Sequence, residues 1–259
     1  MAGIQALIFI PEASRSVRVE LYFPTDTLGE DVPPRGVITL LHGFSGSGDD
    51  WVQLSAAGRY AYDKGYILIC PSCDNSFYND MVYGPPWYAI LTEYLPRQLN
   101  RIFHIPQDRE LNYLAGLSMG GYGALRIGLL NPRRYAGIGA FSGALDIKTL
   151  CGIYAGSPAA RSLFAGIFGD GLSIPDDADL LKLVKTAAEN PEVRGLPLFL
   201  TCGKQDNSEH RVYDQNQAFL RAAEGLSLNL TYREWDGAHQ WSFYDQSFAE
   251  FVAFIDEAG

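Results

Sequence analysis

The sequence predicts a single α/β domain whose central sheet is mostly parallel and is covered by helices on both faces. Short apolar runs bounded by Gly or Pro recur along the chain, which is typical of strands buried on both faces. Segments with helix start and stop signals alternate with these runs, which indicates strand–helix–strand units. A length of 259 residues suits one such domain, and a hydrophobic fraction of 47% provides for its core.

The first part of the chain predicts an antiparallel pair of strands. IQALIFI (4–10) and VRVELYF (17–23) are strand-like, and residues 11–16 supply the turn between them. A polar loop at 24–36 follows. The other strands are predicted from apolar runs: VITLLHG (37–43), YILICP (66–71), LNYLAGLS (111–118), YAGIGAFSG (135–143), LPLFLTCG (196–203) and LNLTYREW (228–235).

Helices are predicted between these runs. Gly65 supplies a C-cap for the first helix, Pro96 kinks or interrupts the second, and Asn131–Pro132 ends the third. Their predicted ranges are 51–65, 85–103, 120–132, 209–225 and 242–259.

Residues 144–195 interrupt this alternation. They separate two predicted strands, yet they are far longer than one crossover helix needs, and they include a helical run at 176–190. We expect them to form a cap-like insertion within the domain of residues 1–259, because long insertions of this kind are usually functional.

The charge is acidic and unevenly distributed. The chain carries 20 basic and 30 acidic residues, a net charge of −10. Residues 1–169 hold 13 basic and 14 acidic residues (13 − 14 = −1), whereas residues 170–259 hold 7 and 16 (7 − 16 = −9). An acidic chain repels phosphate backbones and anionic lipid, so we expect neither a nucleic-acid nor a membrane partner. Neutral substrates suit it better than polyanions.

The cysteines do not predict a disulfide framework or a metal site. Four cysteines in a chain of this length are too few for a disulfide scaffold. Cys70 and Cys73 form a CPSC pair, but no second CxxC completes a zinc site. No apolar run reaches the ~18 residues of a membrane span. The N-terminal stretch lacks a basic segment and a cleavage site, so we expect a cytoplasmic protein.

The motif most specific for chemistry is GLSMG at 116–120, a G-x-S-x-G pattern centred on Ser118. It follows an apolar strand and precedes a helix, which is the context this motif requires. The serine must lie in a sharp, strained turn, and the small residues around it let the strand and the helix pass closely. We therefore predict that Ser118 is a nucleophile.

A serine hydroxyl needs a base, and chain order narrows the choice among the four histidines. In such a fold the order is serine, acid, histidine. His42 and His104 precede Ser118, and His210 lies at the start of a helix where the acid is expected. His239 follows the last predicted strand, in the loop WDGAHQW, so it is the predicted base.

The acid that orients this base is expected in the loop after the penultimate strand. Asp206, at the end of LPLFLTCGKQD, is the predicted acid. Glu209 and Asp214 are nearby alternatives, while Asp236 follows a different strand from the one that should deliver the acid.

Two backbone N–H groups are needed to hold the oxyanion. Met119 supplies one, because it directly follows the predicted nucleophile. The other comes from the loop LLHGFSGSGDDW (40–51), where Phe44 is the predicted donor. A phosphate-binding interpretation of GFSGSG fails because no Gly-Lys-Ser/Thr follows it.

With these pieces in place, the chain resembles the α/β-hydrolase esterases of the tributyrin esterase, or acetyl esterase, type, which are related to the esterase D group. Its oxyanion loop reads HGFSG rather than the HGLTC of S-formylglutathione hydrolases, and region 148–180 follows the family only loosely. The matching motifs are LLHGFSGSGDDW (40–51), PSCDNSFYNDMVYG (71–84), AGLSMGGYGAL (115–125), FSGALD (141–146), FGD (168–170), CGKQD (202–206) and GAHQWSFYDQ (237–246).

This resemblance implies a serine carboxylesterase that acts on short acyl chains such as acetyl or butyryl, without a metal or organic cofactor. It implies the same triad of Ser118, Asp206 and His239 and the same oxyanion amides of Phe44 and Met119. Such esterases are often oligomeric, so a homo-oligomer is compatible with it.

The substrate class stays open among several alternatives. The alternatives that fit the fold are a deacetylase or feruloyl esterase acting on acylated sugars and an S-formylglutathione hydrolase-like thioesterase. An acyltransferase, in which a sugar or alcohol replaces water, and a non-catalytic binding protein on the same scaffold fit it as well. Trp87, Tyr88 and Trp241 are candidates to line the substrate pocket, with core packing as the alternative role of each.

Overall fold

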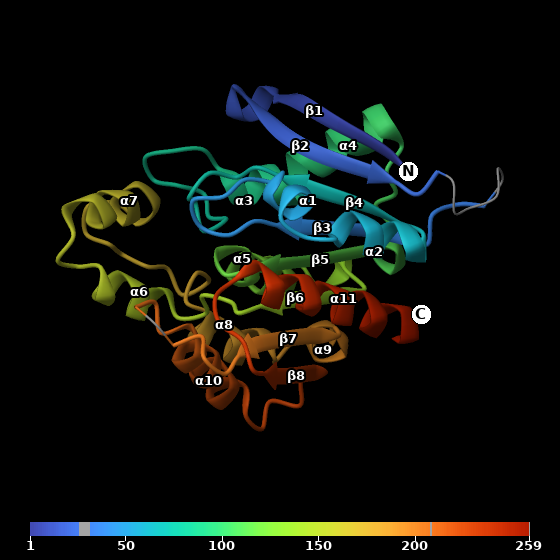
Figure 1. Ribbon diagram of the computed structural model, residues 1–259. Coiled ribbons are helices and arrows are strands. Elements are labelled where there is room, and N and C mark those ends of the chain that lie inside the picture. Colours follow the sequence, from blue (N-terminus) through green and yellow to red (C-terminus); the bar gives the residue numbers. More distant parts are fainter. Residues whose placement is uncertain (26–31, 208, 259) are drawn as a thin grey trace.

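The computed structural model describes residues 1–25, 32–207 and 209–258, and its centre is one eight-stranded sheet. The strands lie in the order β1-β2-β4-β3-β5-β6-β7-β8, which Figure 1 shows from top to bottom. Their bounds are β1 Ala2–Ile10, β2 Arg15–Phe23, β3 Gly36–Leu41, β4 Tyr66–Pro71, β5 Asn112–Leu117, β6 Gly137–Phe141, β7 Leu198–Gly203 and β8 Leu230–Trp235.

The sheet is mostly parallel, as the apolar runs predict. β1 pairs antiparallel with β2, and β2 pairs antiparallel with β4, while all pairs from β4 to β8 are parallel. The predicted antiparallel pair at the start of the chain is therefore confirmed. Because parallel strands share one direction, the loops that follow β3, β5, β7 and β8 all leave from the same edge of the sheet.

Helices cover both faces of the sheet. The helix bounds are α1 Asp50–Gln53, α2 Ala57–Lys64, α3 Trp87–Ala89, α4 Leu95–Phe103, α5 Met119–Leu130, α6 Ile147–Ile153, α7 Pro158–Phe168, α8 Leu180–Ala187, α9 Pro191–Gly195, α10 Val212–Ala223 and α11 Trp241–Ala258. Short 3₁₀ turns lie at Pro11–Ala13, Arg109–Leu111 and Pro132–Arg134.

Two clusters of buried side chains show how these layers pack. One cluster joins α1, α2 and α11 to one face of the sheet, with Trp51, Phe248 and Phe251 among its members. The other joins α4, α5, α8 and α10 to the opposite face, where Leu125 of α5 and Phe219 of α10 are buried. Sheet residues contribute to both clusters because their side chains alternate between the two faces.

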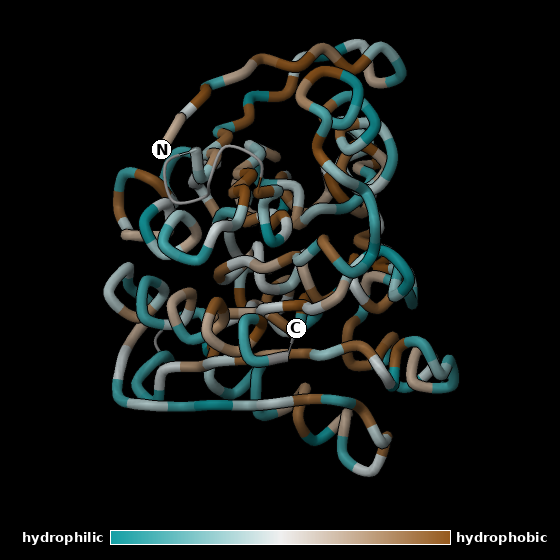
Figure 2. Tube along the Cα trace, turned by 90° about the vertical axis from the view of Figure 1, so that its right-hand side faces the viewer, coloured by the Kyte–Doolittle hydropathy of each residue, from teal (hydrophilic) through white to brown (hydrophobic). Residues whose placement is uncertain are grey.

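Hydrophobic residues also reach the outside of the molecule. Figure 2 shows them along the strand that begins at the N-terminus, where Leu7 and Phe9 of β1 are exposed. In the described part of the chain, no helix is long and apolar enough to cross a membrane.

The helix predicted at 51–65 is in fact two helices. The chain breaks between α1 and α2, where the Ser55 hydroxyl donates to the Trp51 carbonyl and the Ala56 N–H donates to the Asp245 carboxylate at 2.6 Å. Asp245 lies on α11, so a partner distant in sequence imposes this break.

The helix predicted at 85–103 is irregular rather than simply kinked at its proline. A π-helical turn, Ile90–Tyr94, separates α3 from α4, and Pro96 lies in the first turn of α4. Proline is tolerated there because the first N–H groups of a helix have no partner within the helix.

Residues 144–195 hold α6, α7, α8 and α9 between β6 and β7. Asp146 and Asp179 cap α6 and α8, each accepting a hydrogen bond from a backbone N–H. The end of α7 is held by the loop after β4, because Val82 N–H donates to the Ile167 carbonyl at 3.1 Å. The predicted polar loop at 24–36 lies partly outside the described residues, at 26–31.

Candidate active site

Ser118 lies in the tight turn between β5 and α5. Its backbone has φ 53° and ψ −115°, a conformation that L-residues rarely adopt. The turn is held on both sides, because Ser118 N–H donates to the Phe141 carbonyl at 2.9 Å and Ala144 N–H donates to the Ser118 carbonyl at 3.0 Å. The turn therefore presents the side chain at the carboxyl-terminal edge of the sheet.

Two glycines make room for this turn. A Cβ on Gly116 would lie 2.5 Å from the Gly120 backbone, and a Cβ on Gly120 would lie 2.3 Å from the Leu41 carbonyl oxygen. These distances are shorter than any van der Waals contact allows. The G-x-S-x-G pattern thus corresponds to a real steric requirement where β5, α5 and β3 meet.

Three side chains that are far apart in sequence form one chain of hydrogen bonds here. His239 Nε2 lies 2.9 Å from Ser118 Oγ, and His239 Nδ1 lies 2.8 Å from Asp206 Oδ2. Since an ionised carboxylate only accepts, Nδ1–H donates to Asp206 and Nε2 accepts from the serine hydroxyl. Ser118 and Asp206 are buried and the His239 side chain is 24% exposed, so an imidazole open to the cavity joins two buried groups.

The loops that carry Asp206 and His239 are bonded to each other. Gln205 N–H donates to the Gly237 carbonyl at 3.0 Å, and Gly237 N–H donates to Gln205 Oε1 at 2.6 Å. A Cβ on Gly203 would lie 2.3 Å from that same Gly237 carbonyl oxygen, so the two loops meet closely. This contact holds the Asp206–His239 distance.

The other carboxylates considered from the sequence do not reach His239. Asp214 accepts hydrogen bonds from Arg211 and Asn207, and the Glu209 side chain is 78% exposed. Asp236 accepts a hydrogen bond from Gln205 Nε2 at 3.3 Å.

The backbone N–H groups of Phe44 and Met119, which the sequence predicts as oxyanion donors, are not paired with an acceptor among the described residues. Both residues line the same cavity as Ser118. Met119 is the first residue of α5, where a helix leaves its N–H groups unpaired and its dipole favours negative charge.

His42 supports the loop after β3 that carries Phe44. Its Nδ1–H donates to the Gly43 carbonyl at 2.7 Å, and its Nε2 accepts from Cys73 N–H at 2.9 Å. The Tyr78 hydroxyl donates to the His42 carbonyl at 2.7 Å. Burial lowers the pKa of His42 below its ordinary value, so this imidazole stays neutral and serves as a scaffold for the loop.

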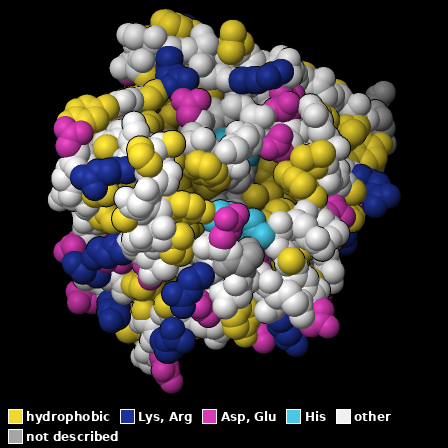
Figure 3. Space-filling view, turned by 60° about the vertical axis from the view of Figure 1, so that its left-hand side comes forward, with side chains coloured by type: hydrophobic (Ala, Val, Ile, Leu, Met, Phe, Trp, Pro, Cys, Tyr) yellow, Lys and Arg dark blue, Asp and Glu magenta, His cyan; other side chains and the backbone are white. Residues whose placement is uncertain are grey.

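These groups open into a cavity of about 700 Å³. Figure 3 shows a hollow on this face where histidine side chains lie beside hydrophobic ones. Trp241 lines the cavity and packs edge-on against Trp51, with ring centroids 5.4 Å apart. The remaining lining includes Phe77, Leu117, Ala144, Leu150, Tyr154, Leu163, Phe164, His210, Val212 and Tyr244.

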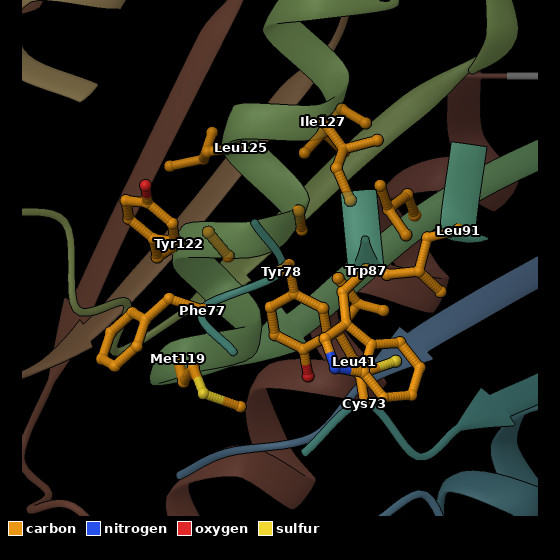
Figure 4. Packing of buried hydrophobic residues seen from close by; sticks show 14 of the residues in the cluster. Leu41, Cys73, Phe77, Tyr78, Trp87, Leu91, Met119, Tyr122, Leu125 and Ile127 are labelled. Atoms are coloured by element: carbon orange, nitrogen blue, oxygen red, sulfur yellow. The ribbon is translucent and has the colours of Figure 1, made fainter. Parts of the chain in front are cut away.

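Of the two roles that the sequence leaves open for Trp87 and Tyr88, the structure shows packing in or against the core, and neither residue is part of the cavity lining. Trp87 is fully buried on the α5 side of the sheet, where Figure 4 shows it beside Tyr78, Leu91 and Cys73. The Tyr88 ring lies under the Arg126 guanidinium, 4.7 Å from its centroid, and its hydroxyl accepts from Asn131. Both rings pack in or against the hydrophobic core because α3 faces α5.

Several cavity residues were not predicted from the sequence. Tyr154, Leu163 and Phe164 come from residues 144–195. The sequence pattern of this region does not indicate which of its side chains face the cavity. His210 was considered only as a base, although its position four residues after Asp206 places it in a loop at the same edge of the sheet.

The two cysteines of the CPSC pair lie in the hydrophobic core. Cys70 and Cys73 are free and fully buried, and burial raises the pKa of both thiols. Among the described residues, no group of three or more His, Cys, Asp or Glu side chains is arranged to hold a metal ion.

The chain matches known proteins over nearly its whole length. The Esterase family model ("Putative esterase") matches residues 10–255. An acetyl esterase of Caldicellulosiruptor saccharolyticus is 30% identical over 87% of this chain and 86% of its own. An S-formylglutathione hydrolase of Rattus norvegicus is 28% identical over 95% and 88%.

Solved structures show the same fold. The fluorophosphonate-binding serine hydrolase FphF of Staphylococcus aureus superposes with a TM-score of 0.85 at 24% identity, covering 98% of both chains. A ferulic acid esterase superposes with a TM-score of 0.82 at 18% identity. From the family match and the acetyl esterase relative, the chain belongs to the Esterase family and is a serine carboxylic ester hydrolase of the α/β-hydrolase fold, related to esterase D.

Proposed function

We propose that this esterase hydrolyses short-chain acyl esters with Ser118 as nucleophile, His239 as general base and Asp206 as the acid that orients the base. The hydrogen-bond chain from Ser118 Oγ through both ring nitrogens of His239 to Asp206 Oδ2 carries the proposal. His239 takes the serine proton as Oγ attacks the ester carbonyl and then gives it to the leaving alcohol. A water molecule activated by His239 then releases the acid.

The Phe44 and Met119 amides bind the oxyanion in this proposal. They line the same cavity as Ser118 and have no acceptor within the described protein. Each such donor typically contributes ~10²–10³ in rate. The buried His42 and Tyr78 hold the loop that carries Phe44, so this donor is fixed before substrate binds.

A small, neutral ester fits the cavity best. No Lys or Arg is among its described lining residues, and Asp50 adds a carboxylate. An aromatic row of Phe44, Phe77 and Phe164, with successive centroids 6.4 and 5.8 Å apart, provides an apolar wall for a short acyl chain. α6 and α7 supply much of the remaining wall, so residues 144–195 act as a cap.

A p-nitrophenyl ester series from acetate to octanoate, assayed on wild type and on Ser118→Ala, tests this proposal. We expect a fall in kcat/KM beyond butyrate and loss of turnover in Ser118→Ala. Ser162→Ala, an exposed serine of α7, is the matched control and should keep activity. Equal turnover by Ser118→Ala would contradict the role of Ser118 and point to another nucleophile. No turnover by wild type, together with no labelling by a fluorophosphonate, would favour a non-catalytic binding protein.

A second candidate is a thioesterase that acts on S-formylglutathione. The full-length similarity to S-formylglutathione hydrolases favours it. Glutathione is an anion, however, and the described cavity lining offers it no cationic partner. We therefore expect a lower kcat/KM for S-formylglutathione than for p-nitrophenyl acetate, and the opposite order would make the thioesterase the better assignment.

A further inference from the structure

A second histidine lies in the same cavity as His239, and the proposed mechanism does not use it. His210 is in the loop between β7 and α10, and its ring centroid is 6.1 Å from that of His239 at an angle of 63°. Its side chain is 39% exposed, so the cavity reaches it.

The backbone of His210 is fixed to the base of the cap. Gln215, which is 2% exposed, donates from Nε2 to the His210 carbonyl at 2.6 Å. The Oε1 of the same side chain accepts from Asp146 N–H at 2.9 Å, and Asp146 caps α6. A buried amide thus joins the loop of His210 to the cap.

The contacts of the His210 ring determine which nitrogen carries its proton. Nδ1 is hydrogen-bonded to the Tyr154 hydroxyl, and the two rings lie 5.8 Å apart. The Glu209 carboxylate lies 3.9 Å from Nε2, too far for a hydrogen bond but close enough to favour a proton there. Of the two neutral tautomers, these contacts favour the one that accepts from Tyr154 at Nδ1 and carries its N–H at Nε2.

The proposed mechanism also determines what lies beside His210. The leaving oxygen must contact His239 Nε2 to take its proton, so the rest of the alcohol extends over the cavity groups next to that ring. His210 is such a group. The rings are 6.1 Å apart and both line the cavity, so two oxygens on neighbouring carbons of one alcohol are close enough together for each to contact one ring.

From this we infer that His210 Nε2–H donates a hydrogen bond to a hydroxyl or ether oxygen on the leaving alcohol, so that an ester whose alcohol carries such an oxygen is preferred over its alkyl counterpart. Tyr154 is the positioning residue, since it holds His210 in the donor tautomer. This inference rests on the proposed function and specifies its alcohol.

Two acetate esters of the same shape isolate this contact. In 2-hydroxyethyl acetate a hydroxyl replaces the terminal methyl of propyl acetate. The quantity measured is the ratio of their kcat/KM values, from acetate release, divided by the ratio of their hydroxide-catalysed rates. We expect wild type to prefer the hydroxyl ester by about fivefold or more, the effect of one neutral hydrogen bond.

Variants at position 210 show whether the preference depends on the hydrogen bond donated by the side chain or only on the volume that the side chain fills. His210→Gln places an amide N–H near the former Nε2 and should keep most of the preference. His210→Asn is too short to do so and should bring the normalised ratio to about one. Tyr154→Phe should lower it part of the way, because the ring is then free to move its proton to Nδ1. His104→Asn, a change of an exposed histidine at the end of α4, should not alter it.

The outcomes distinguish this inference from the function on which it rests. If wild type hydrolyses both esters with a normalised ratio of one, or if His210→Asn keeps the wild-type ratio, the role of His210 is wrong and the esterase mechanism stands. If wild type hydrolyses neither ester nor any p-nitrophenyl ester, the proposed function fails as well.

Discussion

Ser118 has an unfavourable backbone conformation, and its neighbours maintain it. A residue outside the common φ/ψ regions costs about 1–3 kcal/mol, which the rest of the fold must offset. Here the hydrogen bonds with Phe141 and Ala144 come from the adjacent strand β6 and the loop that follows it. The Ser118 hydroxyl, the proposed nucleophile, is thus positioned by packing within the protein itself.

Asp206→Asn tests the role of the buried acid. An amide at this position no longer favours the tautomer with the proton on Nδ1, so the imidazole loses its orientation as a base. We expect kcat for p-nitrophenyl acetate to fall by about 10³–10⁴-fold. Asp236→Asn, an exposed change in the loop of His239, is the control and should stay near wild type. Similar losses in both variants would contradict the assignment.

Tyr244→Phe tests an unusual buried hydroxyl. The Tyr244 ring packs edge-on against His239 with centroids 5.4 Å apart, and none of the residues that the structure describes forms a hydrogen bond with its hydroxyl. Burial, and next the nearby Asp206 charge, raise the pKa of this phenol, so it is neutral. Because an unpaired buried hydroxyl is unfavourable, its removal should stabilise the protein by about 1 kcal/mol in urea unfolding. A loss of stability would reveal a partner for this hydroxyl.

At the scale of elements, the strands follow from the sequence much better than the helix boundaries. Continuous apolar runs locate the parallel strands to within two residues, because burial on both faces leaves a strong local signal. The break between α1 and α2 depends on Asp245, 189 residues further along the chain from Ala56, so no local pattern contains it.

Glycine substitutions test the packing between β5 and α5. Gly116→Ala would place a Cβ 2.5 Å from the Gly120 backbone, and backbone cannot move aside as a flexible side chain can. We expect the unfolding free energy to fall by at least about 2 kcal/mol. Gly152→Ala is the control, since nothing lies within 4 Å of its Cβ and Ala favours the α6 helix by about 0.5–1 kcal/mol. Equal effects in the two variants would refute the steric argument.

At the scale of the whole molecule, the order of loops along the sheet edge made the site predictable. Ser118, Asp206 and His239 follow β5, β7 and β8, and chain order with residue type was enough to predict that these three side chains come together. The sequence did not predict whether the aromatic side chains of α3 face the cavity or the core. Trp87 lies against α5 rather than in the cavity because of how α3 packs, and that packing is non-local.

The stability of the whole domain should depend on pH through His42. The folded imidazole is buried and neutral with a lowered pKa, while the unfolded one titrates near 6.5. Below that pH the unfolded chain binds the extra proton, so stability is constant above about pH 6.5 and falls by up to about 1.4 kcal/mol per pH unit below it. Urea unfolding between pH 8 and 5 measures this slope. His104→Asn should keep it, and a rise in stability on acidification would contradict it.

The cavity wall and the proposed reacting groups come from different segments of the chain, and this separation has an evolutionary consequence. Helices α6 and α7 and the residue after α6 contribute Leu150, Tyr154, Leu163 and Phe164 to the wall, yet the proposed triad and oxyanion amides all lie elsewhere. Mutations in these two helices can therefore change which ester fits while the reacting groups keep their supports. Substrate preference can diversify in one segment while the chemistry is inherited unchanged in the rest, which makes this scaffold readily evolvable.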